Sequence, residues 1–273
     1  MRPLLTKLLI FLLGLSAAGA VEIYRWRDER GQFHFSDKLR EGAERLRLTT
    51  DRSYQTVRYV YDGDTVTLTS GKKIRLLGIN TPEIEGRNKS AEPGGEEAKR
   101  WLTQALKDQR VNVVLDVEKQ DKYGRTLAHL ITENKRHINV EIVRAGLATA
   151  NIHPPNLLYS RELVAAQDEA ETAARGIWRL PDYQPKPASA IKAGSHRGWQ
   201  RIVGRVQTVK TTRKFVYLTL TDHVDLRLER SNLALFPSPK SYVGKTLEAR
   251  GWLNKSKTHF SMLIRHPSAL KLL

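Results

Sequence analysis

The alternation of apolar and polar residues predicts a series of short β-strands in the middle of the chain. Tight turns are expected at Asp62-Gly63 and Ser70-Gly71, because both dipeptides suit hairpin connections. A charged turn with the sequence DKYG, residues 121–124, separates two later strands. The five predicted strands lie at residues 56–61, 64–69, 73–79, 110–120 and 125–132.

Apolar residues at helical spacing predict three helices in the same region. The first covers 95–108, where acidic residues in the first turn favour a helix N-terminus. The second covers 138–148 and is expected to stop near Gly146, and the third covers about 159–174. Five strands and three helices predict an α+β domain over residues 51–180, a partly open Greek-key barrel with helices packed beside it.

A smaller module is predicted at residues 21–50. Alternating apolar residues on both sides of a turn at Asp28–Gly31 predict a β-hairpin there. It resembles a small uncharacterised hairpin module found near the start of exported proteobacterial proteins. A single hairpin is not stable alone. A structural appendage packed on the next domain is the favoured interpretation, and no chemistry is assigned to it.

The C-terminal part of the chain predicts a second domain. Residues 181–198 are rich in Pro, Ala, Ser and Gly and predict a linker. Residues 199–273 contain short alternating strands with glycine or polar turns. This pattern predicts a small all-β, barrel-like domain, which looks like an oligonucleotide-binding-type fold.

The first twenty residues predict a secretory signal peptide. A basic start precedes an apolar run at 8–18, and Ala18-Gly19-Ala20 fits a small-residue cleavage site. The mature chain would then begin near Val21 in the periplasm or outside the cell, with an uncleaved membrane anchor as the alternative. The chain has no cysteine, which excludes disulfides, thiolate metal sites and a lipoprotein anchor.

Charge favours an anionic partner. The net charge is +17, and residues 196–273 hold 15 Lys and Arg against 4 Asp and Glu, which gives 15 − 4 = +11. Such a balance favours nucleic acid or an anionic membrane surface, whereas no protein partner is implied. A basic groove with aromatic platforms binds single strands without sequence preference; each aromatic could instead be core. The aromatics among these basic residues are Trp199, Phe215, Tyr217, Trp252 and Phe260.

Polar residues gather where two predicted strands end. If 64–69 and 73–79 pair as a hairpin, their distant ends meet and place Asp64 near Asn80, Thr81 and Glu83. Oxygen ligands without histidine or cysteine suit a hard cation such as Ca²⁺ or Mg²⁺.

Two arginines complete this set of residues. Arg75 lies within the apolar run 74–79 and needs a partner or an anionic ligand, because a lone charge in a strand core is costly. Arg125 follows the DKYG turn and could reach the same place. Two guanidinium groups, a carboxylate and a divalent cation are the parts that stabilise a phosphodiester transition state.

Five motifs in order resemble those of the thermonuclease, or staphylococcal nuclease-like, family. They are VYDGDTVTL, IRLLGINTPE, DKYGRTLA, NVEIVRAGLA and RGIW, and they lie between residues 56 and 178. The resemblance implies a five-stranded oligonucleotide-binding-type barrel with three helices. It also implies a calcium-dependent phosphodiesterase that acts on DNA and RNA and leaves 3′-phosphate ends.

Roles carried over by motif follow from the same resemblance. Arg75 and Arg125 would bind and stabilise the scissile phosphate, and Glu83 would position or deprotonate the attacking water. The implied metal ligands are Asp64, Asn80 and Thr81, and the implied nucleotide contacts are Lys122 and Tyr123.

Two departures from the family pattern leave the activity open. Family members with a strong metal site carry aspartate where this chain has Asn80, so weaker Ca²⁺ binding is expected, with Mg²⁺ or Mn²⁺ as alternatives. The segment 148–156 lacks the tyrosines that stack on a base, and His153 is a weak substitute. The main alternative is a non-catalytic nucleic-acid-binding protein on the same fold. A membrane- or envelope-associated structural protein is a third class.

Overall fold

A computed structural model describes residues 22–28, 33–36, 38, 42–47, 53–86, 90–192 and 199–273. The chain divides into two compact units, Met1–Arg52 and Ser53–Leu273. The predicted signal peptide lies outside the described residues. None of the helices within the described ranges combines the length and apolar character that a membrane span requires.

The N-terminal unit contains a small antiparallel sheet rather than a lone hairpin. Its strands are β1 (Glu22–Arg27), β2 (Phe33–Ser36) and β3 (Glu44–Arg47), in the order β2-β1-β3. The pairing of β1 with β2 is the expected hairpin, and β3 is a strand that the sequence pattern did not predict. The Trp26 and His34 rings stack across this hairpin at 5.4 Å.

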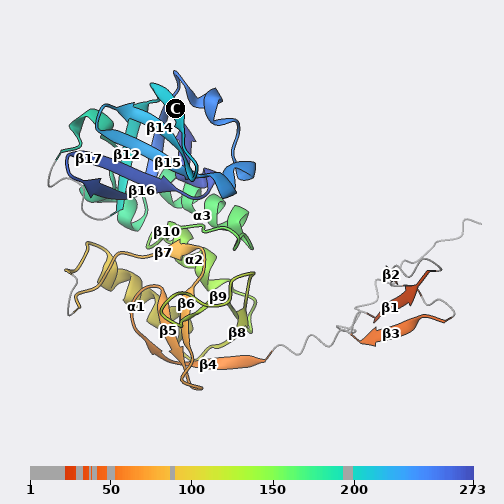
Figure 1. Cartoon of the computed structure of the whole chain (residues 1–273). Helices are drawn as coiled ribbons and strands as arrows, with labels where there is room; N and C mark the ends of the chain where they lie inside the picture. Colours follow the sequence, from red (N-terminus) through yellow and green to blue (C-terminus); the bar gives the residue numbers. More distant parts are fainter. Residues whose placement is uncertain are drawn as a thin grey trace, which may run out of the picture. The chain divides into compact units, whose positions relative to one another are not determined.

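The second unit begins with a closed five-stranded barrel (Figure 1). The barrel is closed in the order β4-β5-β6-β9-β8, so the prediction of a partly open barrel was wrong, because β4 pairs with β8 and completes the ring. Each strand turns its buried side chains toward one apolar core. The strands are β4 (Tyr54–Val60), β5 (Thr65–Leu68), β6 (Lys73–Leu76), β8 (Arg110–Val114) and β9 (Thr126–Thr132).

Three helices complete this α+β region, as the sequence predicts. They are α1 (Gly95–Leu106), α2 (Ile138–Arg144) and α3 (Ser160–Thr172). Helix α1 turns Ala98, Leu102 and Leu106 into the barrel core. A two-stranded sheet that was not predicted joins β7 (Ile79–Asn80) to β10 (Thr149–Ala150), with Asn80 opposite Thr149. This pairing brings the segment after β10 beside the end of the Arg75 strand.

The C-terminal region is the second all-β part. Its eight-stranded sheet has the order β11-β12-β16-β17-β15-β14-β13, with β18 paired to β16. One apolar cluster fills it, and Phe260 is buried there. The strands are β11 (Lys186–Pro187), β12 (Trp199–Arg205), β13 (Thr208–Thr211), β14 (Phe215–Thr221), β15 (Val224–Glu229), β16 (Thr246–Ser256), β17 (His259–Ile264) and β18 (Leu270–Leu272).

Residues 181–192, predicted to be linker, are instead packed into the C-terminal region. Strand β11 pairs in parallel with β12, and Ala188 and Ile191 are buried in the core of the sheet. The short turns of this segment carry no periodicity that a sequence pattern could detect.

The 3₁₀ helices of this unit are η1 (Gly176–Arg179), η2 (Pro181–Tyr183), η3 (Ala188–Ala190), η4 (Arg230–Leu235), η5 (Pro239–Tyr242) and η6 (Pro267–Ala269).

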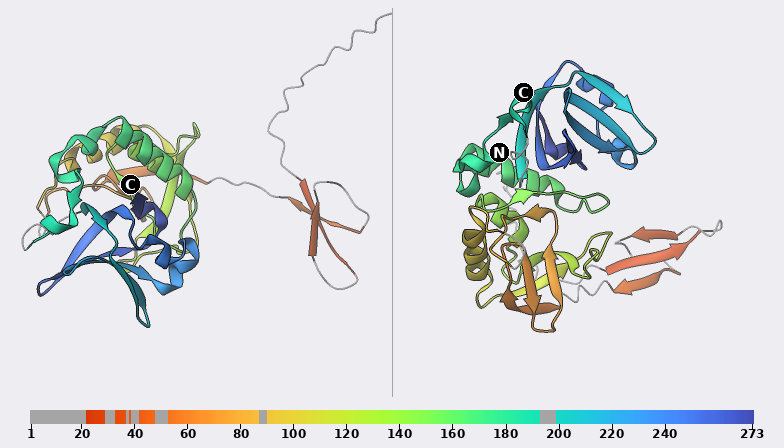
Figure 2. Two further views of the ribbon diagram at one scale, coloured as in Figure 1. Left: turned by 90° about the horizontal axis from the view of Figure 1, so that it is seen from above. Right: turned by 60° about the vertical axis from the view of Figure 1, so that its left-hand side comes forward.

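A buried ion cluster joins α3 to the C-terminal sheet. Glu171 of α3 pairs with Arg201 of β12 and, at 2.8 Å, with Arg250 of β16. Glu248 also pairs with both arginines, and the two guanidinium groups lie over the Trp178 ring. Figure 1 and the right-hand view of Figure 2 show α3 between the barrel and the sheet. Barrel and sheet therefore meet in a charged, largely buried contact.

Candidate active site

Asp64 and Arg75 form a buried ion pair at the end of the β5–β6 hairpin. The Asp64 side chain is 8% exposed, and its Oδ2 lies 2.9 Å from Nη2 of Arg75. The same oxygen accepts a hydrogen bond from the backbone N–H of Thr81 at 3.2 Å. The Thr65 hydroxyl donates to Oδ1 at 3.1 Å. The hairpin therefore brings Asp64, Arg75 and Thr81 together.

Gly63 permits the close approach that places Asp64 there. A Cβ at this position would lie 2.7 Å from Cβ of Ala98 on α1 and 2.7 Å from Cγ2 of Thr81. Only glycine fits between the turn and these neighbours. The Asp62 carboxylate accepts a hydrogen bond from the Asp64 N–H at 3.0 Å, which closes the turn.

Arg75 is held by the backbone as well as by Asp64. Its Nη1 donates to the carbonyl oxygens of Leu76 and Ile79, at 2.6 and 3.0 Å. Its Nη2 donates to Oδ1 of Asn80 at 3.1 Å. The Asn80 amide then donates to the carbonyl oxygen of Thr81 at 2.9 Å. These bonds fix the guanidinium with 14% of its side chain exposed.

The loop after β7 places Glu83 against the start of α1. The Glu83 N–H donates to the Glu92 carboxylate at 3.0 Å, and the Glu92 N–H donates to the Glu83 carbonyl at 2.8 Å. A Cβ on Gly95 would lie 2.4 Å from that carbonyl oxygen. The Glu83 backbone is therefore clamped between Glu92 and the helix.

Arg125 is oriented by the turn that precedes it. Its Nε lies 2.7 Å from Oδ2 of Asp121, which also accepts hydrogen bonds from the Tyr123 and Arg125 N–H groups through Oδ1. A longer contact of 3.4 Å runs from Nη1 of Arg125 to the Thr65 hydroxyl. The guanidinium lies over the Tyr123 ring at 5.6 Å. Arg125 thus extends from β9 toward the β5 residue beside Asp64.

Two cavities open around these residues. One of about 400 Å³ is lined by Asp62, Thr65, Glu83 and Arg125. Another of about 760 Å³ is lined by residues that include Arg75, Lys122, Tyr123, Arg125 and Arg265. Arg125 therefore lines both cavities, whereas Glu83 lines only the first and Arg75 only the second.

The acidic turn concentrates negative charge. Burial and the neighbouring Asp64 carboxylate raise the pKa of Asp62 to about 6, against an opposing effect of Arg75. Within the described residues, no group of three or more histidines and carboxylates is arranged to hold a metal ion. The oxygen donors that are present are the two aspartates, the Asn80 amide and the Thr81 carbonyl.

The predicted residues therefore do not form a single cluster. Asp64, Arg75, Asn80 and Thr81 contact one another, Glu83 and Arg125 line a shared cavity, and Lys122 and Tyr123 project from the DKYG turn. Lys122 lies over the Tyr123 ring at 5.0 Å.

Sequence reasoning missed two residues here. Asp121, in the motif itself and four residues before Arg125, could have been found as its carboxylate partner from that spacing. Arg265 had no local signal, because it reaches this cavity from the C-terminal region.

Comparisons with known proteins agree with this fold and with the order of its motifs. The family model "Staphylococcal nuclease homologue" matches residues 73–180, and the model "Domain of unknown function (DUF4124)" matches residues 10–58. The thermonuclease of Staphylococcus intermedius is 37% identical over 125 residues, 45% of this chain and 74% of the relative. That of Staphylococcus hyicus is 33% identical over 136 residues, 49% of this chain and 79% of the relative. Endonuclease YncB of Bacillus subtilis is 30% identical over 127 residues, 45% of this chain and 60% of the relative. The chain therefore belongs to the staphylococcal nuclease, or thermonuclease, family.

Proposed function

We propose that this chain is an exported, metal-dependent nuclease that hydrolyses phosphodiester bonds of DNA and RNA and leaves 3′-phosphate ends. One observation carries the proposal: Glu83 and Arg125 line one cavity, and Thr65 in its wall bonds to the carboxylate that pairs with Arg75. Arg75 lines the second cavity, and Arg125 lines both. A carboxylate and two fixed guanidinium groups around two cavities that share Arg125 suit attack of water on a phosphodiester. Family membership supports the nuclease reaction.

Each side chain receives a role that its surroundings support. Arg75 and Arg125 bind the non-bridging phosphate oxygens and stabilise the charge that develops on them. Glu83 orients the attacking water and accepts its proton. Lys122 and Tyr123 contact a neighbouring phosphate from the DKYG turn, where both side chains are exposed. The clamped backbone of Glu83 and the hydrogen-bonded guanidinium of Arg75 keep these groups in place without large rearrangement.

The donor set suits a hard divalent cation. Asp64, Asn80 and the Thr81 carbonyl would hold it, and the Asp62 carboxylate lies in the same turn as Asp64. When bound, the ion acts as a Lewis acid toward the phosphate. We propose Ca²⁺, with Mg²⁺ or Mn²⁺ as alternatives, because Asn80 supplies a neutral oxygen instead of a charged one. The cation has to compete with Arg75, which bonds to Asp64 and Asn80.

A second candidate is a nucleic-acid-binding protein without catalysis. The bond between Arg75 and the Asn80 amide oxygen favours it, because that oxygen is then less available to a cation. Both candidates predict nucleic-acid binding. They differ in whether the bound strand is cut.

A cleavage assay on residues 21–273 separates the two. We expect single-stranded DNA and RNA to be cut with Ca²⁺ and not with EDTA, and Mg²⁺ and Mn²⁺ are compared in parallel. Glu83→Gln should lower the rate by about 10²–10⁴-fold, the range for loss of general-base assistance, while binding remains. Glu97→Gln, an exposed carboxylate on α1, is the matched control. Tight binding without cleavage under any metal would favour the non-catalytic candidate.

The product ends are tested in the same reaction. If hydrolysis leaves 3′-phosphates, a 3′-phosphatase should lower the negative charge of the fragments without changing their number of nucleotides. Fragments that carry 5′-phosphates instead would contradict this part of the proposal.

Export is a separate part of the proposal, supported by the apolar run at 8–18 and the small residues at 18–20. We expect the chain to be recovered from the periplasm or the medium with a mass that begins near Val21. A full-length mass in the membrane fraction would indicate an uncleaved anchor instead.

A further inference from the structure

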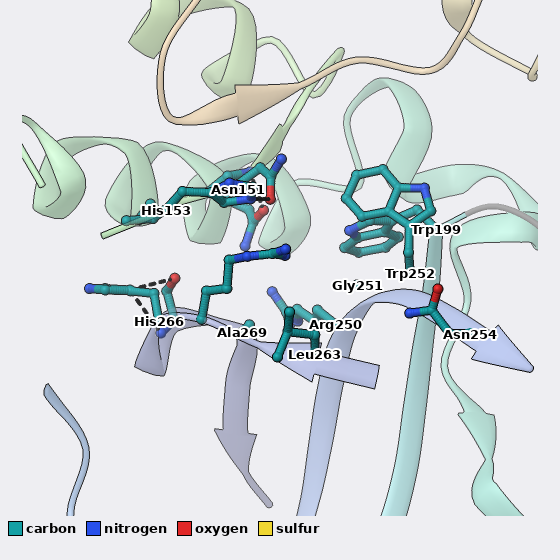
Figure 3. A pocket seen from close by; sticks show the side chains of 15 residues that line it. Asn151, His153, Trp199, Arg250, Gly251, Trp252, Asn254, Leu263, His266 and Ala269 are labelled. Carbon is teal, nitrogen blue, oxygen red and sulfur yellow. Dashed lines mark hydrogen bonds between the residues drawn. The ribbon is translucent and has the colours of Figure 1, made fainter. Parts of the chain in front are cut away.

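A third cavity lies between the end of the nuclease barrel and the C-terminal sheet (Figure 3). It measures about 240 Å³. Its nuclease side is formed by residues 150–153, directly after the β7–β10 pair, and its other side by β16, β17 and the segment that follows. Figure 3 shows Trp199 and Trp252 at one end of it, His153 and His266 at the other, and Arg250 and Leu263 between them.

This cavity shares part of its lining with the larger cavity of the candidate active site. Asn151, His153 and Arg265 line both. We treat the two cavities as one groove, lined from Arg75 and Arg125 past these three residues to the two tryptophans. We call this the interdomain groove. The β7–β10 pairing places Asn80 and the segment 151–153 next to each other, so the groove begins at the proposed site of cleavage.

The middle of the interdomain groove holds an unpartnered cation. Arg265 is half-buried, and it makes no hydrogen bond or ion pair with any residue that the structure describes. Loss of hydration lowers the pKa of His153 to about 4, although this residue keeps an exposed surface, and the charges of Arg265 and Arg75 lower it further. Two positive charges therefore act on the segment that lines both cavities. A half-buried guanidinium without a partner suits an anionic ligand such as a phosphate.

The far end offers a ring on which a flat ligand can stack. Trp252 is 39% exposed, although it lies directly opposite Trp199 in the β12–β16 pairing. Trp199 itself packs against Trp178 and Tyr183, with ring centroids 6.0 and 5.5 Å away. The supported Trp199 fixes this wall of the cavity, and Trp252 keeps an accessible surface. Exposed tryptophan rings beside arginines are used to stack unpaired bases.

We propose that the interdomain groove binds single-stranded nucleic acid that extends beyond the cleavage site, with a phosphate at Arg265 and an unpaired base stacked on Trp252. The proposal rests on the proposed function for its class of substrate. It assigns to the C-terminal region a specific part in substrate binding, on the face that meets the barrel. A duplex does not suit the far end, because its bases are already stacked on one another and cannot reach the Trp252 ring.

Another surface of the same sheet competes with this assignment. Phe215 lies on the outer face beside Arg227, whose guanidinium is 5.3 Å from the ring centroid. Phe215 does not line the interdomain groove. General attraction of a polyanion to a basic domain would depend on such surfaces as much as on the groove. The test therefore has to compare the two faces.

Binding of labelled oligothymidylate in EDTA tests the groove without cleavage. Fluorescence anisotropy at one fixed salt concentration compares a strand of about 15 nucleotides with one of about three nucleotides. We expect Trp252→Ala and Arg265→Ala each to weaken binding of the long strand by about tenfold, within the range measured for loss of a stacked base. Binding of the short strand should change less than twofold. Trp252→Phe should retain most of the affinity, because a phenyl ring still stacks.

Two matched controls lie outside the groove. Arg213→Ala removes a positive charge from the turn between β13 and β14, and Phe215→Ala removes the outer aromatic ring. Both should leave the affinity for the long strand within about twofold. The slope of log affinity against log salt should fall by about 0.7 in Arg265→Ala, the value for one phosphate contact on a single strand. The same slope should be unchanged in Arg213→Ala.

The outcomes separate this proposal from the proposed function. Unchanged binding in Trp252→Ala and Arg265→Ala, or a larger loss in Phe215→Ala, would overturn the groove assignment even if the wild-type chain cuts DNA. Loss of long-strand binding in the two groove variants would support it even if no metal restored cleavage. If Trp252→Ala does not fold, Arg265→Ala decides the question, because the Arg265 side chain makes no hydrogen bond or ion pair with any described residue.

Discussion

Asn80 makes side-chain hydrogen bonds to Arg75 and Thr81, two residues on which the proposed chemistry depends. Its amide oxygen accepts from Arg75, and its amide nitrogen donates to the Thr81 carbonyl oxygen. A carboxylate in the same place could not donate to Thr81, and it would add a second negative charge beside Asp64. The asparagine therefore links Arg75 to the Thr81 carbonyl while it lowers the negative charge available to a cation.

Asn80→Asp tests this balance at a single residue. We expect the Ca²⁺ dissociation constant to fall by about tenfold, because an added unit charge beside a divalent cation contributes more than the 1.4 kcal/mol that this factor requires. Competition from Arg75 keeps the gain below the full Coulomb energy. Isothermal titration calorimetry of the wild type, Asn80→Asp and Asn80→Ala measures it, and Asn80→Ala should bind more weakly. Identical titrations for all three would show that Asn80 is not a ligand.

Sequence reasoning could predict for a physical reason that Arg75 needs a partner or an anionic ligand, and the structure shows Asp64 as that partner. A charged residue within a buried strand needs a counter-charge, and the β5–β6 hairpin allows only a few candidates for it. Arg125 was harder to place, since the long DKYG turn fixes its direction through Asp121. Arg265 could not be placed at all, because nothing near it in the sequence indicates which domain face it lies on.

Periodicity explains which elements could be predicted. Strands and helices that bury one face have a regular apolar pattern, so α1 was expected at 95–108 and is observed at Gly95–Leu106. Closure of the barrel has no such signal, because the β4–β8 pairing joins segments far apart in sequence. The two-residue strands β7 and β10 are too short to show alternation. Yet their pairing determines which segment lies beside Asn80 and so forms the start of the interdomain groove.

The aromatic residues of the C-terminal sheet also show what periodicity cannot predict. Alternation correctly predicted strands around Phe215 and Phe260, but it could not say which rings face the core. The structure buries Phe260, packs Trp199 against its neighbours and leaves Trp252 partly exposed. Trp252 is therefore the most exposed of these three rings, whereas a count of aromatic residues treats all three as equally available to a ligand.

Across the whole molecule, some positive charges are available to bind a ligand, and others are buried in ion pairs that stabilise the fold. The C-terminal region holds most of the net positive charge, yet Arg201 and Arg250 are buried in ion pairs with Glu171 and Glu248. These two arginines are unavailable to a substrate. They instead connect the sheet to α3, and Gln167 of α3 and Arg250 of β16 both line the interdomain groove. Stability of the contact and binding of an extended strand should therefore be linked.

Glu171→Ala tests that link. The substitution leaves Arg201 and Arg250 without one of their two counter-charges in a largely buried place, and loss of a buried partner typically costs about 3–5 kcal/mol. Urea unfolding should show a lower midpoint for the sheet, ahead of the barrel, and binding of a long single strand should weaken even though Glu171 does not line the shared wall. Glu169→Ala, on the same helix as Glu171, is the matched control: its pairs with Arg144 and Arg175 are exposed, so the unfolding midpoint should change little. Equal unfolding midpoints for the two variants would mean that the ion cluster does not hold the sheet against the barrel, and that the groove depends on other contacts.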